Sequence, residues 1–253
     1  MARKLGKKKN HISEAAKRTN FNVFVATPAY DGKVDTGYCQ SITDAAFACP
    51  LFGIKMTLSV LANGAFIDLA RNQFVKAFLE EHKECTHLFF IDADLSFPPE
   101  AFVGLVRAGL PIVAGVYPKR QEKEEYPVLW EDHPDGGLWV EDEFIMARRV
   151  PTGFLLIERS VVEEMAADAE KLRLTGTEGT VPRLFYTDIH PHSEGGNTFI
   201  GEDFQFCDDY RKKYNRPIHV WPHIEFTHGK VKGECAEYLN RMVNGEPSDR
   251  SAA

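Results

Sequence analysis

The sequence predicts an α/β domain with a mostly parallel central sheet flanked by helices. Three observations predict it: apolar segments of strand length recur through the first half, segments of helical periodicity lie between them, and turns containing proline or glycine separate the two. Strands joined through helices return in the same direction, which gives a parallel sheet. At 253 residues the chain is long enough for one such domain.

The first half alternates strand and helix. Strands are predicted over 21–27, 55–61, 88–91 and 111–116, and helices over 37–49, 66–81 and 99–108. The clearest helix is 66–81, where Phe66, Phe74 and Phe78 share an apolar face. This order predicts a doubly wound arrangement.

The second half is more polar. Residues 121–149 are rich in turn formers, and Asp135-Gly-Gly137 predicts a hairpin turn between 128–130 and 138–140. A strand over 151–157, a helix over 159–171, a helix over 201–214 and a last strand over 218–221 follow. Without a repeat or a linker, we expect a single domain over 21–235, preceded by a basic flexible arm (1–20) and followed by a C-terminal tail (236–253).

Charge and composition limit the possible classes. The net charge is −7, yet residues 1–18 hold seven Lys or Arg against one acid, so the arm is either a solvated tail or a contact for a polyanion. No apolar run is long enough to span a membrane or to act as a secretory signal. Five scattered cysteines without a C-x-x-C pair argue for reduced thiols, hence a cytoplasmic location, or the host cytoplasm if the chain is viral.

The most informative segment is 87–100, where a short apolar strand ends at Asp92 and Asp94 before Pro98 and Pro99 open a helix. Ligands bind at the carboxyl ends of strands in open α/β sheets. Two carboxylates one residue apart offer hard oxygen ligands to Mg²⁺ or Mn²⁺ and leave positions for substrate phosphates. The alternative is a surface aspartate pair in a capping loop.

Two further segments lie beside predicted strand ends. Asp68 shares a helix face with Arg71 and likewise with Asn72, so Arg71 either contacts a phosphate or forms an ion pair with Asp68. Thr152 and Gly153 open a strand, where glycine permits close approach of a ligand or simply ends a turn.

Two more residues offer acid–base or ligand chemistry. Asp203, next to Glu202 at a predicted helix start, is either a cap or a general base. His228 is a candidate imidazole ligand for a borderline metal such as Mn²⁺, although chemistry alone does not single it out among the nearby histidines.

The order of these motifs resembles that of the GT-A glycosyltransferases, and most nearly the small family-two-like enzymes of bacteria and viruses, including phages. The motifs are Thr-Pro-x-Tyr, Ala-Arg-Asn, Phe-Ile-Asp-Ala-Asp, Pro-Thr-Gly-Phe, Gly-Glu-Asp-Phe and a late histidine, covering about residues 21–230. The polar middle is shorter than in the family, and an acceptor domain is missing.

The resemblance implies a GT-A (Rossmann-like) fold and metal-dependent transfer of a sugar from a nucleotide-diphosphate sugar, with a UDP-sugar favoured, to a hydroxyl acceptor. It implies that Asp203 is the catalytic base of an inverting reaction and that Glu202 orients it. Asp94 and His228 would ligate Mn²⁺ or Mg²⁺, and Asp92 would contact the metal or the donor ribose. The other implied donor-binding residues are Thr27, Pro28, Tyr30, Asp31, Asp68, Arg71, Thr152 and Gly153.

The acceptor stays open: a glycan, a protein hydroxyl, a small molecule or a modified pyrimidine in DNA. Two other classes compete. A phosphatase of the haloacid-dehalogenase type would use Asp92 as nucleophile and Asp94 as acid, but Leu95-Ser96-Phe97 stands where that family carries a small pair such as Gly-Thr. The third class is a non-catalytic nucleotide-sugar-binding protein.

Overall fold

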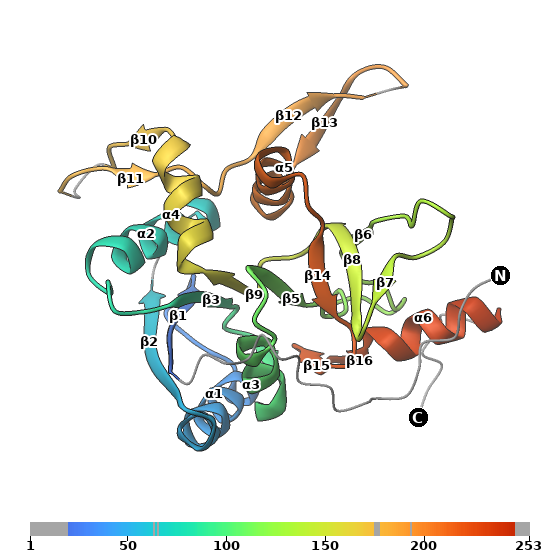
Figure 1. Ribbon diagram of the computed structural model, residues 1–253, viewed down its shortest axis with the longest axis horizontal. Coiled ribbons are helices and arrows are strands. Elements are labelled where there is room, and N and C mark those ends of the chain that lie inside the picture. The colour runs from blue at the N-terminus through green and yellow to red at the C-terminus, as the bar shows by residue number, and fades with distance from the viewer. Residues whose placement is uncertain (1–19, 63, 65, 175–177, 193, 246–253) are drawn as a thin grey trace.

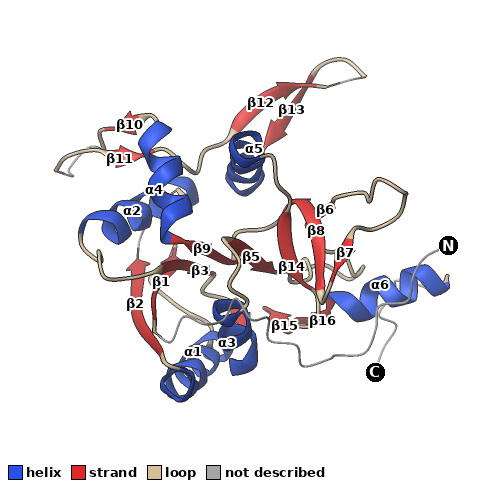
Figure 2. Cartoon of the chain, in the orientation of Figure 1, coloured by secondary structure: helices blue, strands red, loops and turns tan. Residues whose placement is uncertain are grey.

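A nine-stranded mixed sheet forms the centre of the structure, and helices cover both of its faces (Figures 1 and 2). The computed structural model describes residues 20–62, 64, 66–174, 178–192 and 194–245, so the predicted arm lies outside the described residues apart from Asn20. The strand order is β2-β1-β3-β9-β5-β14-β8-β6, and β7 also pairs with β8. The strands of this sheet are β1 (Phe21–Ala29), β2 (Ile54–Ala62), β3 (His87–Ile91), β5 (Ile112–Gly115), β6 (Leu129–Trp130), β7 (Val140–Glu141), β8 (Phe144–Arg149), β9 (Phe154–Glu158) and β14 (Ile218–Trp221).

The direction of the strands differs in part from the predicted parallel sheet. β1 pairs in parallel with β2 and β3, and β5 pairs in parallel with β14. β9 lies antiparallel between β3 and β5, and β8 is antiparallel to β14, β6 and β7. The sheet is therefore mixed. No helix intervenes between β5 and β9, so those strands need not return in the same direction.

The helices form two layers around a core that is apolar on both sides of β3. The first layer contains α2 (Ile67–Glu80), α4 (Arg159–Asp168) and α5 (Glu202–Tyr214), and the second contains α1 (Thr36–Ala48) and α3 (Pro99–Arg107), with the 3₁₀ turn η2 (Cys49–Phe52) after α1. Leu88 and Phe90 of β3 pack toward the first layer, and Phe89 and Ile91 toward the second. Burial on both faces explains why this strand carries an unbroken apolar run.

The predicted α/β alternation is confirmed. Each predicted helix is present, and its predicted ends agree with the observed ends within about three residues. The strands predicted over 21–27, 55–61, 88–91, 111–116, 151–157 and 218–221 are present as β1, β2, β3, β5, β9 and β14.

The predicted hairpin between 128–130 and 138–140 is wrong in its pairing. Gly136 and Gly137 do turn the chain, with φ of +93° and +80°. However, β6 and β7 both pair with β8, and only the isolated bridge between Asp132 and Leu138 joins the two arms directly. The apolar centre of β8 is buried in the core, and β8 pairs with β14 as well as with both short strands.

Several short elements extend the sheet-and-helix core. β4 (Leu95–Ser96), β15 (Glu225–His228) and β16 (Val231–Glu234) form a three-stranded sheet, while β10 (Lys171–Leu172) pairs with β11 (Val181–Pro182) and β12 (Asp188–Pro191) with β13 (Asn197–Ile200). α6 (Cys235–Asn244) occupies most of the described part of the expected C-terminal tail. Its Cys235 and Leu239 are buried in the core and Arg241 forms an ion pair with the buried Glu124, so the packed structure continues beyond residue 235.

Among the described residues, none of the helices combines the length and the apolar character that crossing a bilayer requires.

Candidate active site

The candidate site lies at the carboxyl end of β3, where the sequence predicts it. Asp92 directly follows the strand, and β9 begins beside it because Ile91 and Phe154 are antiparallel partners. The backbone N–H of Asp92 donates to the carbonyl of Gly153 at 2.9 Å. The sheet therefore brings the Asp-x-Asp loop and the Thr152-Gly153 segment together.

Both carboxylate oxygens of Asp92 accept hydrogen bonds from buried side chains. Arg71 Nη2 lies 3.4 Å from Oδ1, and the Tyr117 hydroxyl donates to Oδ2 at 3.3 Å. Burial, followed by the charge of Asp92, raises the pKa of Tyr117 well above its ordinary value, so the phenol keeps its proton and donates it. Asp92 is thus held in one orientation from both sides.

Gly153 leaves the space that this arrangement needs. A Cβ at this position would lie 2.2 Å from Asp92 Oδ2 and 2.2 Å from the Tyr117 hydroxyl oxygen. Any side chain would therefore push the carboxylate and the phenol out of place.

Replacing Gly153 by alanine is expected to impair donor binding and turnover and to cost about 1–3 kcal/mol of stability, the usual range for overpacking. Donor affinity measured by calorimetry and the midpoint of thermal unfolding check both effects. Gly64→Ala is the matched control, since among the described residues its added Cβ would meet Ala70, at an ordinary contact distance of 3.4 Å. Unchanged donor affinity in Gly153→Ala would contradict the role given to this glycine.

Arg71 joins the two acidic parts of the site. It lies on α2 with only 4% of its surface exposed, and its guanidinium pairs with Asp92 and with Glu202 on α5. Burial disfavours the charge, but the carboxylates of Asp92, Glu202 and Asp203 raise the pKa of Arg71 above its ordinary value. The structure thus places Arg71 as a buried bridge between α2, α5 and the Asp-x-Asp loop, with little surface left for a nucleotide.

Asp203 is a carboxylate whose environment opposes ionisation. It lies in the first turn of α5, and its Oδ1 accepts from the backbone N–H of Phe204 at 2.7 Å. Burial is the main cause that raises the pKa of Asp203 to about 6, and the neighbouring Glu202 adds to it, while Arg71 acts in the opposite direction. A carboxylate with a pKa near neutrality suits proton abstraction from a hydroxyl.

The three-stranded sheet brings His228 next to Asp94. β15 pairs antiparallel with β4, so His228 is opposite Leu95, one residue after Asp94. His228 Nε2 lies 3.5 Å from Asp94 Oδ2, and Arg120 Nη2 forms an ion pair with the same oxygen. The ring of Tyr117 stands edge-on to that of His228, with centroids 5.0 Å apart, and so connects this pair with Asp92.

The chemistry of this donor pair fits a divalent cation. His228 Nδ1 lies 2.8 Å from the carbonyl oxygen of Pro118, which only accepts, so Nδ1 carries the proton and Nε2 presents a lone pair toward Asp94. Burial is the main cause that lowers the pKa of His228, which favours the neutral ring that binds metals. Two ligands of one Mg²⁺ or Mn²⁺ ion are separated by about 3.0–3.5 Å, as these two atoms are.

Asp92 does not complete a compact set of three ligands with Asp94 and His228. Within the described ranges, the three His, Cys, Asp or Glu residues with ligand atoms within 4.8 Å of one another are His82, Glu84 and Cys85. Asp92 instead accepts hydrogen bonds from Arg71 and Tyr117. Of its two expected roles, contact with the donor suits this position better than metal ligation.

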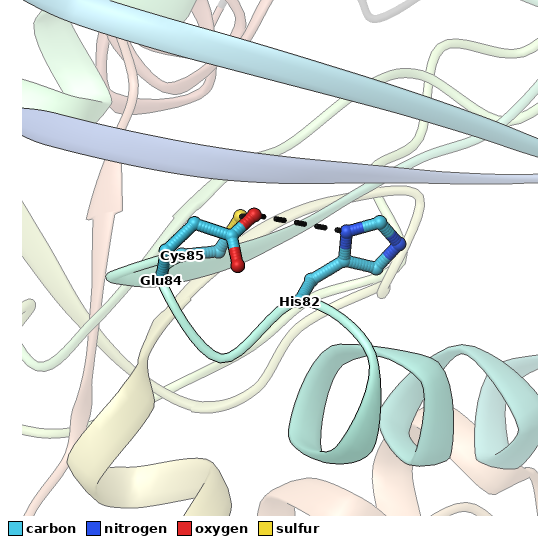
Figure 3. Close-up of side chains that lie close together, drawn as sticks. All are labelled: His82, Glu84 and Cys85. Carbon is cyan, nitrogen blue, oxygen red and sulfur yellow. Dashed lines mark hydrogen bonds and ion pairs between the residues drawn. The ribbon is translucent and has the colours of Figure 1, made fainter.

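The cluster of His82, Glu84 and Cys85 (Figure 3) lies between α2 and the beginning of β3, at the opposite end of the strand from Asp92. Burial raises the pKa of Cys85, which keeps the thiol protonated. The guanidinium of Arg159 donates to the carbonyl of His82 at 2.7 Å and also bonds that of Cys85. A protonated thiol and a fixed neighbouring cation both disfavour a metal, so we interpret this cluster as part of the turn that ends α2.

The predicted donor residues at the end of β1 differ in their exposure. Thr27 is fully buried and its hydroxyl shares a 2.6 Å hydrogen bond with Tyr38, so its side chain does not lie on the surface of the site. Pro28 is also buried within β1, whereas Tyr30 is 75% exposed, and Asp31 is exposed and pairs with Lys33. Tyr30 thus remains an open aromatic surface at the end of β1.

Asp68 and Thr152 are the other two predicted donor residues. Asp68 Oδ1 accepts from the backbone N–H of Leu69 at 2.8 Å at the start of α2, and the structure gives it no ion pair with Arg71. Thr152 is 1% exposed, and its hydroxyl lacks a hydrogen-bond partner among the described residues. Asp68 thus has a local capping role, whereas Thr152 has an unassigned buried hydroxyl beside the site.

Sequence reasoning missed Tyr117 and Arg120. Both lie in the loop that follows β5, together with the Pro118 carbonyl that orients His228. β5 runs in the same direction as β3, so its carboxyl end meets the same edge of the sheet. The signal was therefore their position after a predicted strand.

Comparisons with known proteins place the chain in no family. No protein-family model matches, and no curated protein matches. Solved structures with some similarity include A197 from STIV (16% identity, 82% of this chain and 85% of that one, TM-score 0.49), a glycosyltransferase involved in the glycosylation of the major capsid of PBCV-1 (10%, 57% and 63%, 0.30), and HddC from Yersinia pseudotuberculosis (10%, 76% and 97%, 0.29). These similarities are too low to assign a function.

Proposed function

We propose that this chain is a metal-dependent glycosyltransferase of GT-A type, which transfers a sugar from a nucleotide-diphosphate sugar to a hydroxyl acceptor with inversion. The observation that carries the proposal is the pairing of Asp94 with the unprotonated Nε2 of His228 at the carboxyl end of β3. This is a site for a divalent cation, placed where open α/β sheets bind their ligands.

The acid–base group needed for transfer lies in the connected cluster. Arg71 links Asp92 to Glu202, and Asp203 follows Glu202 at the start of α5. In the proposed reaction Asp203 accepts the proton of the acceptor hydroxyl as the oxygen attacks the anomeric carbon. Glu202, fixed by Arg71, keeps the α5 N-terminus in position.

The donor side is proposed to use the other carboxylates. Asp94 and His228 would hold Mn²⁺ or Mg²⁺, which neutralises charge on the departing diphosphate as a Lewis acid. Asp92 is oriented by Arg71 and Tyr117 to accept hydrogen bonds from the donor ribose. The exposed ring of Tyr30 would stack on the base, and a UDP-sugar is the favoured donor.

The geometry gives less support to the two alternatives. A phosphatase needs Asp92 as a nucleophile, but the hydrogen bonds from Arg71 and Tyr117 to its two oxygens lower their nucleophilicity. Lys119 pairs with Glu125, Asp208 with Arg149, and Asp209 with Tyr186, so the residues that such a mechanism would recruit are occupied elsewhere. A non-catalytic binding protein has no need for a carboxylate with the raised pKa of Asp203.

Incubation with UDP-, GDP- and TDP-sugars plus Mn²⁺ tests the proposal. Slow release of the nucleoside diphosphate and free sugar is expected with one donor class, since water replaces the acceptor. Cleavage of a simple phosphate ester would instead favour the phosphatase, and donor binding without turnover, even with added glycan or DNA acceptors, would favour the binding protein.

A further inference from the structure

Arg120 lies where a cation bound by Asp94 would lie. Its guanidinium forms an ion pair with Asp94 Oδ2, the oxygen that also faces His228 Nε2. Its Cδ and Nε are 3.7 Å from the position of a Cβ on Gly229, whose backbone N–H donates to the carbonyl of Asp94. Arg120 thus covers the pair that we assign to the metal.

The guanidinium and a divalent ion cannot share this oxygen at low cost. Both are positive, and like charges on one ligand atom repel strongly where solvent is partly excluded. Only 15% of the His228 side chain and 23% of the Asp94 side chain are exposed. A free metal ion must therefore displace Arg120 before it binds.

The loop permits that displacement without unfolding. The Arg120 side chain is 55% exposed, so it has room to turn toward solvent. The backbone around it is held, because Lys119 N–H donates to the carbonyl of Glu125 at 2.8 Å and Gln121 N–H to that of Lys119 at 2.9 Å. Movement of one side chain is enough.

A diphosphate favours the metal ion over Arg120 at Asp94. Its oxygens carry negative charge next to the metal position, and the planar guanidinium binds phosphate through two parallel hydrogen bonds. A displaced Arg120 would then exchange one anionic partner, Asp94, for another. Metal without diphosphate offers no such exchange.

We propose that Arg120 acts as a substitute cation on Asp94 and His228, and that it moves to the diphosphate when metal and nucleotide bind together. This rests on the proposed function. It makes the binding of metal and donor mutually dependent, and it adds Arg120 to the donor-binding residues.

The experiment measures Mn²⁺ affinity by calorimetry or by electron paramagnetic resonance, with and without the nucleoside diphosphate that the donor assay selects. Arg120→Gln is expected to bind free Mn²⁺ more tightly than the wild type. The gain in Mn²⁺ affinity caused by the nucleotide is expected to shrink by about 5-fold or more, the lower range of typical coupling between sites. Arg120→Lys, which keeps the charge but loses the planar fork, should retain weak binding of free Mn²⁺ and lose part of the coupling.

Lys119→Gln is the matched control. It removes the same charge from the residue next to Arg120, and the side chain of Lys119 pairs with Glu125 rather than with Asp94. It should leave both Mn²⁺ affinities unchanged. Equal Mn²⁺ affinities of the wild type and Arg120→Gln would overturn this inference while leaving the metal site in place. The same change of Mn²⁺ affinity in Arg120→Gln and Lys119→Gln would do so too. Absence of Mn²⁺ binding in every protein, even with nucleotide, overturns the metal site as well.

Discussion

Replacing Asp203 by asparagine is expected to lower turnover by about two to four orders of magnitude, the usual contribution of a positioned general base. Asparagine has nearly the same shape, and its amide oxygen still accepts from the backbone N–H of Phe204. It does not take up a proton from a hydroxyl near neutral pH. Donor affinity should persist, because the hydrogen bonds to Asp92 come from Arg71 and Tyr117.

The same substitution is expected to stabilise the protein above about pH 6. Burial raises the pKa of Asp203 to about 6 from 3.8, so the folded state holds the proton more tightly than the unfolded state does. Stability from this carboxyl is therefore fully present below its unfolded pKa and is lost as pH rises through the folded value. The asparagine side chain of the variant remains neutral and avoids that loss.

Turnover and thermal unfolding between pH 5 and pH 8 check both effects. Wild-type turnover should rise with pH around the pKa of Asp203, about 6, and then level off, and the variant should lack that rise. Asp135→Asn serves as control, since the Asp135 side chain is 91% exposed and, within the part of the chain that the structure describes, its ion pair is with His133. Lower donor affinity with normal turnover would show that Asp203 is structural.

Local patterns explain what could be predicted about the fold. The apolar run of β3 and the helical spacing of α2 each arise within one segment, so the sequence alone reveals them. The two-residue strands β4, β6 and β7 are too short for any periodicity, and β8 lies in a stretch that reads as turns. In addition, β4 and β6 pair with β15 and β8, which lie further along the chain, whereas β7 joins β8 across a two-residue turn.

The same distinction applies to the site. Asp92 and Asp94 stand beside a recognisable strand and were placed correctly at its end. Arg71 was predicted to contact a phosphate or to pair with Asp68; its ion pair with Glu202, 131 residues away, could not be predicted from the local sequence. His228 reaches Asp94 only through the pairing of β15 with β4, and nothing in the local sequence predicts that pairing.

Replacing Asp94 by alanine is expected to abolish transfer and Mn²⁺ binding while the fold stays intact. Asp94 provides the only carboxylate oxygen that the structure, within its described residues, places 3.5 Å from His228 Nε2. Imidazole alone is a poor ligand for Mg²⁺ or Mn²⁺, which prefer oxygen. EDTA should have the same effect on the wild type, and added Mn²⁺ should restore activity there but not in the variant.

A comparison with Asp92→Ala separates the two aspartates. Asp92 is oriented by Arg71 and Tyr117, so its loss should weaken donor binding while Mn²⁺ still binds in the presence of nucleotide. Loss of Asp94 should remove the metal signal altogether and free Arg120 from its ion pair. Full activity of the wild type in EDTA would rule out metal dependence. Normal Mn²⁺ binding by Asp94→Ala would instead place the ion elsewhere, so the two results distinguish a wrong mechanism from a wrong ligand.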